Sequence, residues 1–74
     1  MRTDEELNND VTAELRWEPT VASADISVAT HNGVVTLSGS VPHFAEKMAA
    51  EQAAQRVGGV MAVVDELKIG RAHV

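Results

Sequence analysis

The fold is decided by residues 25–41, DISVATHNGVVTLSGSV, which hold two alternating segments on either side of a tight turn. In each segment apolar residues alternate with small or polar ones, which is the period of a strand with one buried side. Asn32-Gly33 stands between the segments and suits the two positive-φ positions of a type I′ turn. The sequence therefore predicts a β-hairpin. Its predicted buried side chains are Ile26, Val28, Val35 and Leu37.

The segment before the hairpin predicts a helix over residues 3–16. An isolated hairpin is only marginally stable in water, so its apolar side needs such a cover. Thr3 and Glu6 have the spacing of a capping box, which marks a helix start. Pro19 ends the helix, because it disfavours helical backbone at the residue before it. The predicted apolar stripe consists of Leu7, Val11 and Leu15.

A second helix is predicted over residues 44–57. Glu46 has capping-box spacing, but the cap position holds His43, so we expect a helix start weaker by about 1 kcal/mol. Gly58-Gly59 ends the helix, with one glycine in the left-handed conformation. The side expected to face the sheet consists of Ala45, Met48, Ala49, Gln52, Ala53, Arg56 and Val57. The expected outer side consists of Lys47, Glu51 and Gln55, with Lys47 and Glu51 as an i, i+4 ion pair.

A third strand is predicted over residues 60–69, with Leu67 and Ile69 facing the core. Asp65 falls on the same inward register, so we expect a bulge there or a later strand start. Gly39 also stands where a core-facing side chain is expected. A bulge, or a helix that approaches too closely for a Cβ, would account for it.

The predicted fold class is α+β, an α-β-β-α-β sandwich with two helices on one face of a three-stranded mixed sheet. Each predicted helix has one apolar side and the sheet has one strongly apolar face, so both helices cover that face. The place of the third strand in the sheet stays open. The uncovered face, called the open face below, is expected to carry Ser27, Ala29, Val34, Thr36, Ser38, Val64, Glu66 and Lys68.

Length and composition fit one small domain with a thin core, because 74 residues bury little surface. The chain has no cysteine, which excludes disulfides and thiolate metal sites. The longest apolar run, residues 60–64, is far too short for a transmembrane segment, and MRTDEELNND has no hydrophobic signal region. We expect a cytoplasmic protein if Met1 is the natural start, and a periplasmic one if a leader was removed.

The charge distribution argues against nucleic-acid binding. The formal net charge is −5, and residues 1–25 carry all of it, with seven acidic side chains against two basic ones. Affinity for a phosphate backbone depends on clustered Lys and Arg, which the chain lacks.

The residues also give little support for catalysis, a metal or a cofactor. The three histidines, His31, His43 and His73, are scattered over a turn, a helix start and the tail, without metal-ligand spacing. General acid–base and nucleophilic catalysis need a base held beside its partner, and no serine stands in a nucleophile setting. Gly58-Gly59 lacks the lysine and following helix of a phosphate loop. We therefore predict a non-enzymatic protein without cofactor.

The chain resembles a BON domain over about residues 4–70. The most specific stretch is residues 32–41, NGVVTLSGSV, followed at the expected distance by Gly59-Val60 and the Leu67, Ile69 strand. The resemblance implies an αββαβ sandwich and association with phospholipid or the cell envelope, without catalysis. It places the protein among bacterial transport- or osmotic-stress-related proteins. Such modules occur in tandem, and MRTDEELNNDVTAELRWEP resembles the first module of longer multi-BON proteins.

Contact residues are predicted for two alternative partners, phospholipid headgroups and neighbouring BON modules. Lys47 or Arg56 would meet a headgroup, the alternative being ordinary solvated helix charges. Trp17 would stand exposed at an interface, or else pack over the connector and close the core. Val34 and Val64 would make the open face, or an adjoining sheet edge, a surface for packing against another module.

Overall fold

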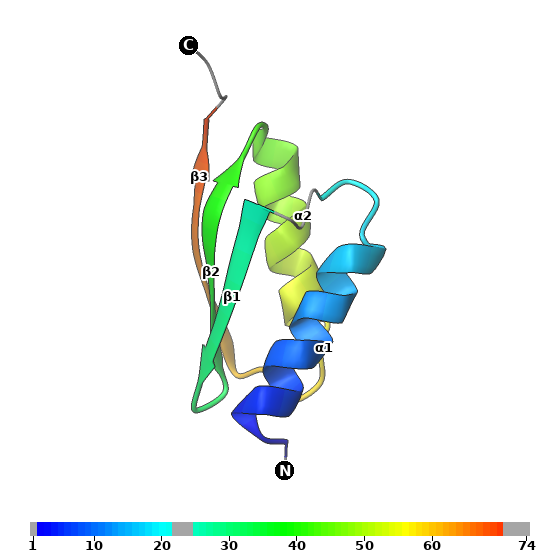
Figure 1. Cartoon of the computed structure of the whole chain (residues 1–74), viewed down its shortest axis with the longest axis vertical. Helices are drawn as coiled ribbons and strands as arrows, with labels where there is room; N and C mark the ends of the chain where they lie inside the picture. Colours follow the sequence, from blue (N-terminus) through cyan, green and yellow to red (C-terminus); the bar gives the residue numbers. More distant parts are fainter. Residues whose placement is uncertain (1, 22–24, 71–74) are drawn as a thin grey trace.

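The computed structural model describes residues 2–21 and 25–70 of the chain. The elements follow in the predicted order α-β-β-α-β (Figure 1). Their bounds are α1 (Asp4–Trp17), β1 (Ile26–His31), β2 (Val34–Val41), α2 (Phe44–Gln55) and β3 (Ala62–Ile69). The ends differ from the predicted ones by one or two residues, where helices and strands commonly fray.

The sheet has the strand order β1-β2-β3, which answers the question the sequence left open. β1 and β2 form the predicted antiparallel hairpin, and β3 lies parallel to β2 after the crossover through α2. The turn has the expected positive φ angles, 52° at Asn32 and 83° at Gly33. β2 is therefore the central strand, and β1 and β3 are the two edges.

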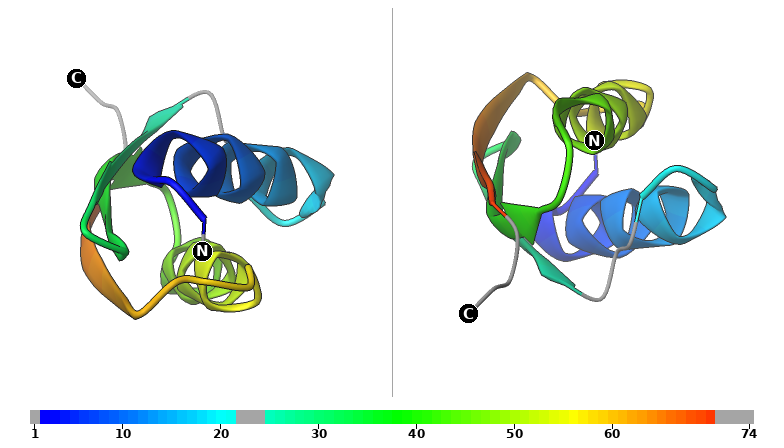
Figure 2. Two further views of the ribbon diagram at one scale, coloured as in Figure 1. Left: turned by 90° about the horizontal axis from the view of Figure 1, so that it is seen from below. Right: turned by 90° about the horizontal axis from the view of Figure 1, so that it is seen from above.

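Both helices lie on the same side of the sheet, as predicted (Figure 2). Between the helices and the sheet lies the core, where Val35 and Leu37 of β2 are fully buried. α1 contributes its predicted stripe of Leu7, Val11 and Leu15. The other side of the sheet is left bare by the elements that the structure describes (Figure 2).

Local signals at the helix ends act mostly as expected. Thr3 and Glu6 form the predicted capping box at the start of α1. At the start of α2 the carboxylate of Glu46 accepts the N–H of His43 at 3.2 Å. Gly59, with φ 97°, supplies the left-handed residue after α2.

The predicted inner side of α2 is wrong in part, because Ala53 is buried and Val57 packs on the core as predicted while other members of the set do not. The residues buried against the sheet are Ala50, Ala53 and Ala54, whereas Gln52 and Arg56 are exposed. Lys47 and Glu51, expected on the outer side, are half-buried. The helix carries alanine on nearly every side, so apolar periodicity could not choose its inner face.

Both explanations offered for Gly39 are also wrong. The pairing with β3 runs through Gly39 without a skipped residue, and the pairing with β1 ends at Gly39 opposite Ile26, so neither register shows a bulge there. What crowds the position is neighbouring backbone, because a Cβ at Gly39 would lie 2.1 Å from the carbonyl oxygen of Asp25. Its φ of 123° also lies where side chains are rarely tolerated.

The irregularity expected at Asp65 is absent. Asp65 pairs with Leu37 within a continuous β3 that begins at Ala62, three residues earlier. Its side chain points inward, toward α2, where a basic partner meets it.

Candidate functional site

Trp17 ends α1 and is 82% exposed, so the alternative in which it closes the core is wrong. The reason lies in the helix itself. Each residue turns an α-helix by about 100°, so a residue two positions after buried Leu15 points to the opposite side. The one tryptophan of the chain therefore stands in solvent at the end of the first helix.

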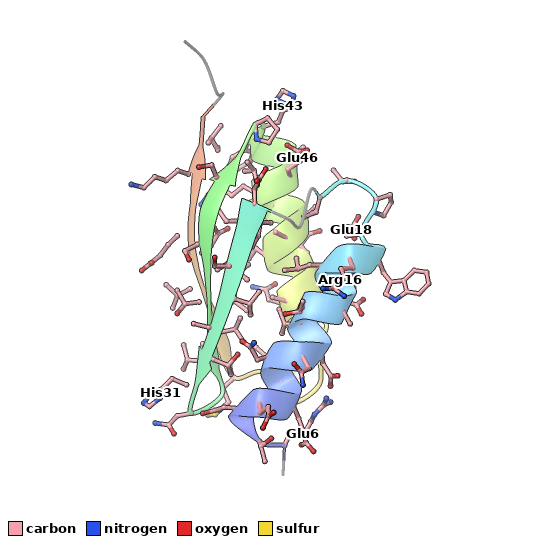
Figure 3. The ribbon with its side chains drawn as sticks, viewed as in Figure 1. Glu6, Arg16, Glu18, His31, His43 and Glu46 are labelled. Carbon is pink, nitrogen blue, oxygen red and sulfur yellow. The ribbon has the colours of Figure 1, made fainter. Side chains whose placement is uncertain are left out.

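Arg56 lies close to this end of α1 and is held by two carboxylates. Its Nη2 is 3.3 Å from Glu14 Oε2 and 3.3 Å from Glu18 Oε1. The hydrogen bond to Glu18, followed in size by the hydrogen bond to Glu14, raises the pKa of Arg56. The guanidinium thus joins the ends of α1 and α2, and its charge is balanced beside Trp17 (Glu18 is labelled in Figure 3).

Lys47 is not the solvated outer charge, paired with Glu51, that the sequence suggested. Its Nζ lies 2.9 Å from Asp65 Oδ1 and donates to the carbonyl oxygen of Leu67 at 2.9 Å. The side chain of Lys47 is 22% exposed and that of Asp65 only 9%. This pair explains how an aspartate fits the inward register of β3.

Glu51 completes a group that we call the edge cluster, Lys47, Glu51 and Asp65. The pKa of Glu51 is raised, chiefly by a hydrogen bond with the Asp65 side chain and also by burial and the charge of Asp65, while Lys47 opposes the shift. Asp65 Oδ2 is buried and has no hydrogen-bond partner among the residues that the structure describes. A proton on Glu51 would give Asp65 Oδ2 a donor, which agrees with the raised pKa of Glu51.

The edge cluster occupies backbone groups of the outer strand. Asp65 Oδ1 accepts the N–H of Leu67 at 3.0 Å, while Lys47 Nζ takes the Leu67 carbonyl. Unpaired N–H and C=O groups on an edge strand are what an additional strand would bind, and inward-pointing charges are one way to block it. At Leu67 this edge of the sheet is therefore closed.

The open face carries the two predicted valines. Val64 of β3 is 41% exposed and pairs with Thr36, while Val34 of β2 is half-buried and pairs with Ala62. They therefore lie diagonally across neighbouring strands, on the side of the sheet away from Lys47. The structure thus divides the predicted contact residues into two groups on opposite sides of the molecule, with Trp17 and Arg56 on the helical side.

An open cavity of about 620 Å³, which sequence reasoning missed, lies at the end of the molecule that holds the hairpin turn. Three segments far apart in the chain form it. Its lining consists of Arg2, Thr3, Asp4, Leu7, Asn32, Gly33, Gly59 and Met61. Arg2 is engaged there by Asp10 and by the carbonyl of Gly58, at 3.1 Å from the latter.

The two histidines that the structure describes are not brought together. His31 lies beside the hairpin turn and His43 at the start of α2, at opposite ends of the molecule (Figure 3). His73 lies outside the described residues. Within residues 2–21 and 25–70, no group of three or more His, Asp and Glu side chains could hold a metal ion.

Comparison with known proteins places the chain in a family. No curated protein matches the sequence. The BON domain family matches residues 3–71, nearly the whole chain. In the part of the chain that the structure describes, neither helix has the length and apolar character needed to cross a bilayer. With its αββαβ fold and this match, the protein belongs to the BON domain family, a family of binding modules.

Proposed function

We propose that this domain is a non-catalytic module that associates with phospholipid surfaces of the cell envelope, with Trp17 as its apolar contact. The observation that carries the proposal is the 82% exposure of this side chain at the end of α1. Tryptophan is favoured at membrane–water interfaces, where its ring is buried and its N–H stays hydrated. Membership of the BON family supports the same function and a setting in transport or osmotic-stress proteins.

Charge makes little contribution to the proposed contact. Arg56, which directly follows α2, is already bound to Glu14 and Glu18. The chain as a whole has a formal net charge of −5, which opposes approach to an anionic surface. Lys47 is engaged by Asp65 and is not part of the proposed contact. The domain should therefore bind zwitterionic vesicles at least as well as anionic ones.

Vesicle co-sedimentation tests the proposal. The 74-residue protein is mixed with phosphatidylcholine vesicles, or with vesicles that also contain phosphatidylglycerol, at low and high salt. We expect wild-type protein to sediment with the vesicles. Most of the Trp17→Ala protein should stay in the supernatant. Phe44→Ala is the matched control, because Phe44 is a 60% exposed aromatic residue on α2. Wild-type protein that stays in the supernatant with both vesicle types contradicts the proposal, as does Trp17→Ala that binds like wild type.

The open face supports a second candidate function, packing against a neighbouring BON module. Val64 is 41% exposed on a face that the described helices leave bare. Val34→Glu with Val64→Glu should abolish any concentration-dependent association in sedimentation velocity. Ala13→Glu with Gln52→Glu adds the same charge at exposed helix positions and serves as control. Association that survives the two valine substitutions counts against this function.

A further inference from the structure

The hairpin turn is held by a carboxylate from the first helix. Asp4 accepts the N–H of Asn32 through Oδ2 at 2.9 Å and the N–H of Gly33 through Oδ1 at 3.1 Å. These two hydrogen bonds lower the pKa of Asp4 from its ordinary value, and the bond to Asn32 has the larger effect. The carboxylate is thus ionised at neutral pH, and both backbone amides of the turn are occupied.

The turn also contains a chemically labile pair. In Asn-Gly, the glycine nitrogen can attack the asparagine side chain with little hindrance, because glycine has no Cβ. A bond forms between Gly33 N and Asn32 Cγ, the bond from Cγ to Nδ2 breaks, and the amide proton leaves with Nδ2 as ammonia. Water then opens the cyclic imide at either carbonyl and leaves aspartate or isoaspartate. The reaction consumes only water and involves no oxidation or reduction.

The backbone conformation at this position favours glycine and so keeps the pair. Gly33 has a φ of 83°, and a Cβ there would lie 3.0 Å from Met61 Cγ. The cavity described above is lined by Asp4, Asn32 and Gly33, so water can reach the turn.

The observed contacts oppose the attack. Gly33 N must lose its proton and turn toward Asn32 Cγ, but its N–H is directed at Asp4 Oδ1, whose negative charge disfavours that loss. The leaving group is also restrained, since Asn32 Nδ2 lies 3.2 Å from His31 Nε2. Both restraints disappear if the start of α1 moves away from the hairpin and the turn relaxes.

We propose that Asn32 is a deamidation site that Asp4 protects, and that it is modified when the start of α1 separates from the hairpin turn. The aspartate or isoaspartate formed at residue 32 then keeps α1 and the turn from closing again. Isoaspartate adds a methylene to the main chain of a two-residue turn, and aspartate places a second carboxylate beside Asp4. Modification at Asn32 is therefore an irreversible record of opening at this end of the molecule.

The test is peptide mapping by mass spectrometry during incubation of the folded protein at neutral pH. We expect slow conversion of Asn32 in wild type and conversion about tenfold faster in Asp4→Ala, because losing a charged hydrogen-bond partner raises the open population by about that factor. Glu5→Ala removes a neighbouring charge without touching the turn and should react like wild type.

A second control separates local opening from global unfolding. Val41→Ala weakens the core at the end of β2 that lies away from the turn, and it leaves Asp4 in place. It should convert more slowly than Asp4→Ala even at equal melting temperature, which mild denaturant can adjust. Conversion of Asp4→Ala at the wild-type rate would overturn the proposal, and so would equal rates in Asp4→Ala and Val41→Ala at matched stability.

Discussion

Lys47 Nζ lies 2.9 Å from Asp65 Oδ1 and joins the second helix to the outer strand. The same ammonium group reaches the carbonyl of Leu67, whose N–H is bound by Asp65. One ion pair thus fixes α2 on β3 and closes part of a sheet edge that would otherwise be open to another strand.

Replacing Lys47 with Met should therefore affect both stability and association. We expect a loss of about 1–3 kcal/mol in the free energy of unfolding, because the Asp65 side chain, only 9% exposed, is left without its partner. Self-association should rise as Leu67 becomes accessible. Urea unfolding and sedimentation velocity measure the two effects. Lys68→Met, at an exposed position of β3, is the control, and equal behaviour of the two variants would refute the role of the edge cluster.

Glu51 gives the domain a pH dependence of definite sign. Its pKa is raised above the ordinary 4.5, so the folded state binds this proton more tightly than the unfolded chain. The stability it contributes is complete below pH 4.5 and is lost as the pH rises through the folded-state pKa. Glu51→Gln should remove this decline and be more stable than wild type at pH 7, since the amide can donate to Asp65 Oδ2.

Melting temperatures between pH 4.5 and 7.5 measure this effect. Glu66→Gln is the control, because it removes the same carboxylate charge at an exposed position. If Glu51→Gln followed the wild-type pH profile, or melted lower at pH 7, the proton between the two carboxyl groups would be ruled out.

Adding a single methyl group at Gly39 should strongly destabilise the domain. Gly39→Ala would place a Cβ 2.1 Å from the Asp25 carbonyl oxygen, at a φ of 123°. We expect at least about 1–3 kcal/mol of destabilisation from this backbone strain. Gly58→Ala is the matched control, because no atom lies within 4 Å of its added Cβ. Chemical denaturation compares them, and an unchanged unfolding midpoint in Gly39→Ala would contradict the observed backbone geometry.

Leu37 tests the core at its centre. Leu37 is fully buried in the central strand, and Leu→Ala changes at such sites cost about 2–5 kcal/mol. A domain of this length has roughly 4–11 kcal/mol in total, so Leu37→Ala should be close to unfolded. Circular dichroism would show this, whereas Thr36→Ala, on the open face, should keep the fold. A well-folded Leu37→Ala would mean that the core lies elsewhere.

The hairpin and α1 could be predicted because their signals are strong and local. Asn32-Gly33 admits few turn types, and the stripe of α1 has Leu and Val on a polar helix. The inner face of α2 could not be chosen, because alanine occurs on almost every side and Lys47 turns inward to meet Asp65. That partner comes from another element, 18 residues away, which periodicity does not record.

The exposure of Trp17 could have been predicted from the sequence. Its angle from Leu15 around the helix already pointed away from the core, but the general tendency of tryptophan to be buried favoured packing. The strand order and the cavity could not be predicted from the sequence, because each depends on how segments far apart in the chain pack together. The link between Asp4 and the hairpin turn is of the same kind, 28 and 29 residues apart in the chain.

The most direct test of the proposed function is the emission spectrum of Trp17 as vesicles are added. The chain has one tryptophan and no tyrosine, so intrinsic fluorescence reports on this residue alone. The proposed contact predicts a solvent-exposed spectrum for the free protein and a shift to shorter wavelength with phosphatidylcholine vesicles, persisting at high salt. An emission maximum that stays unchanged with both zwitterionic and anionic vesicles would contradict it.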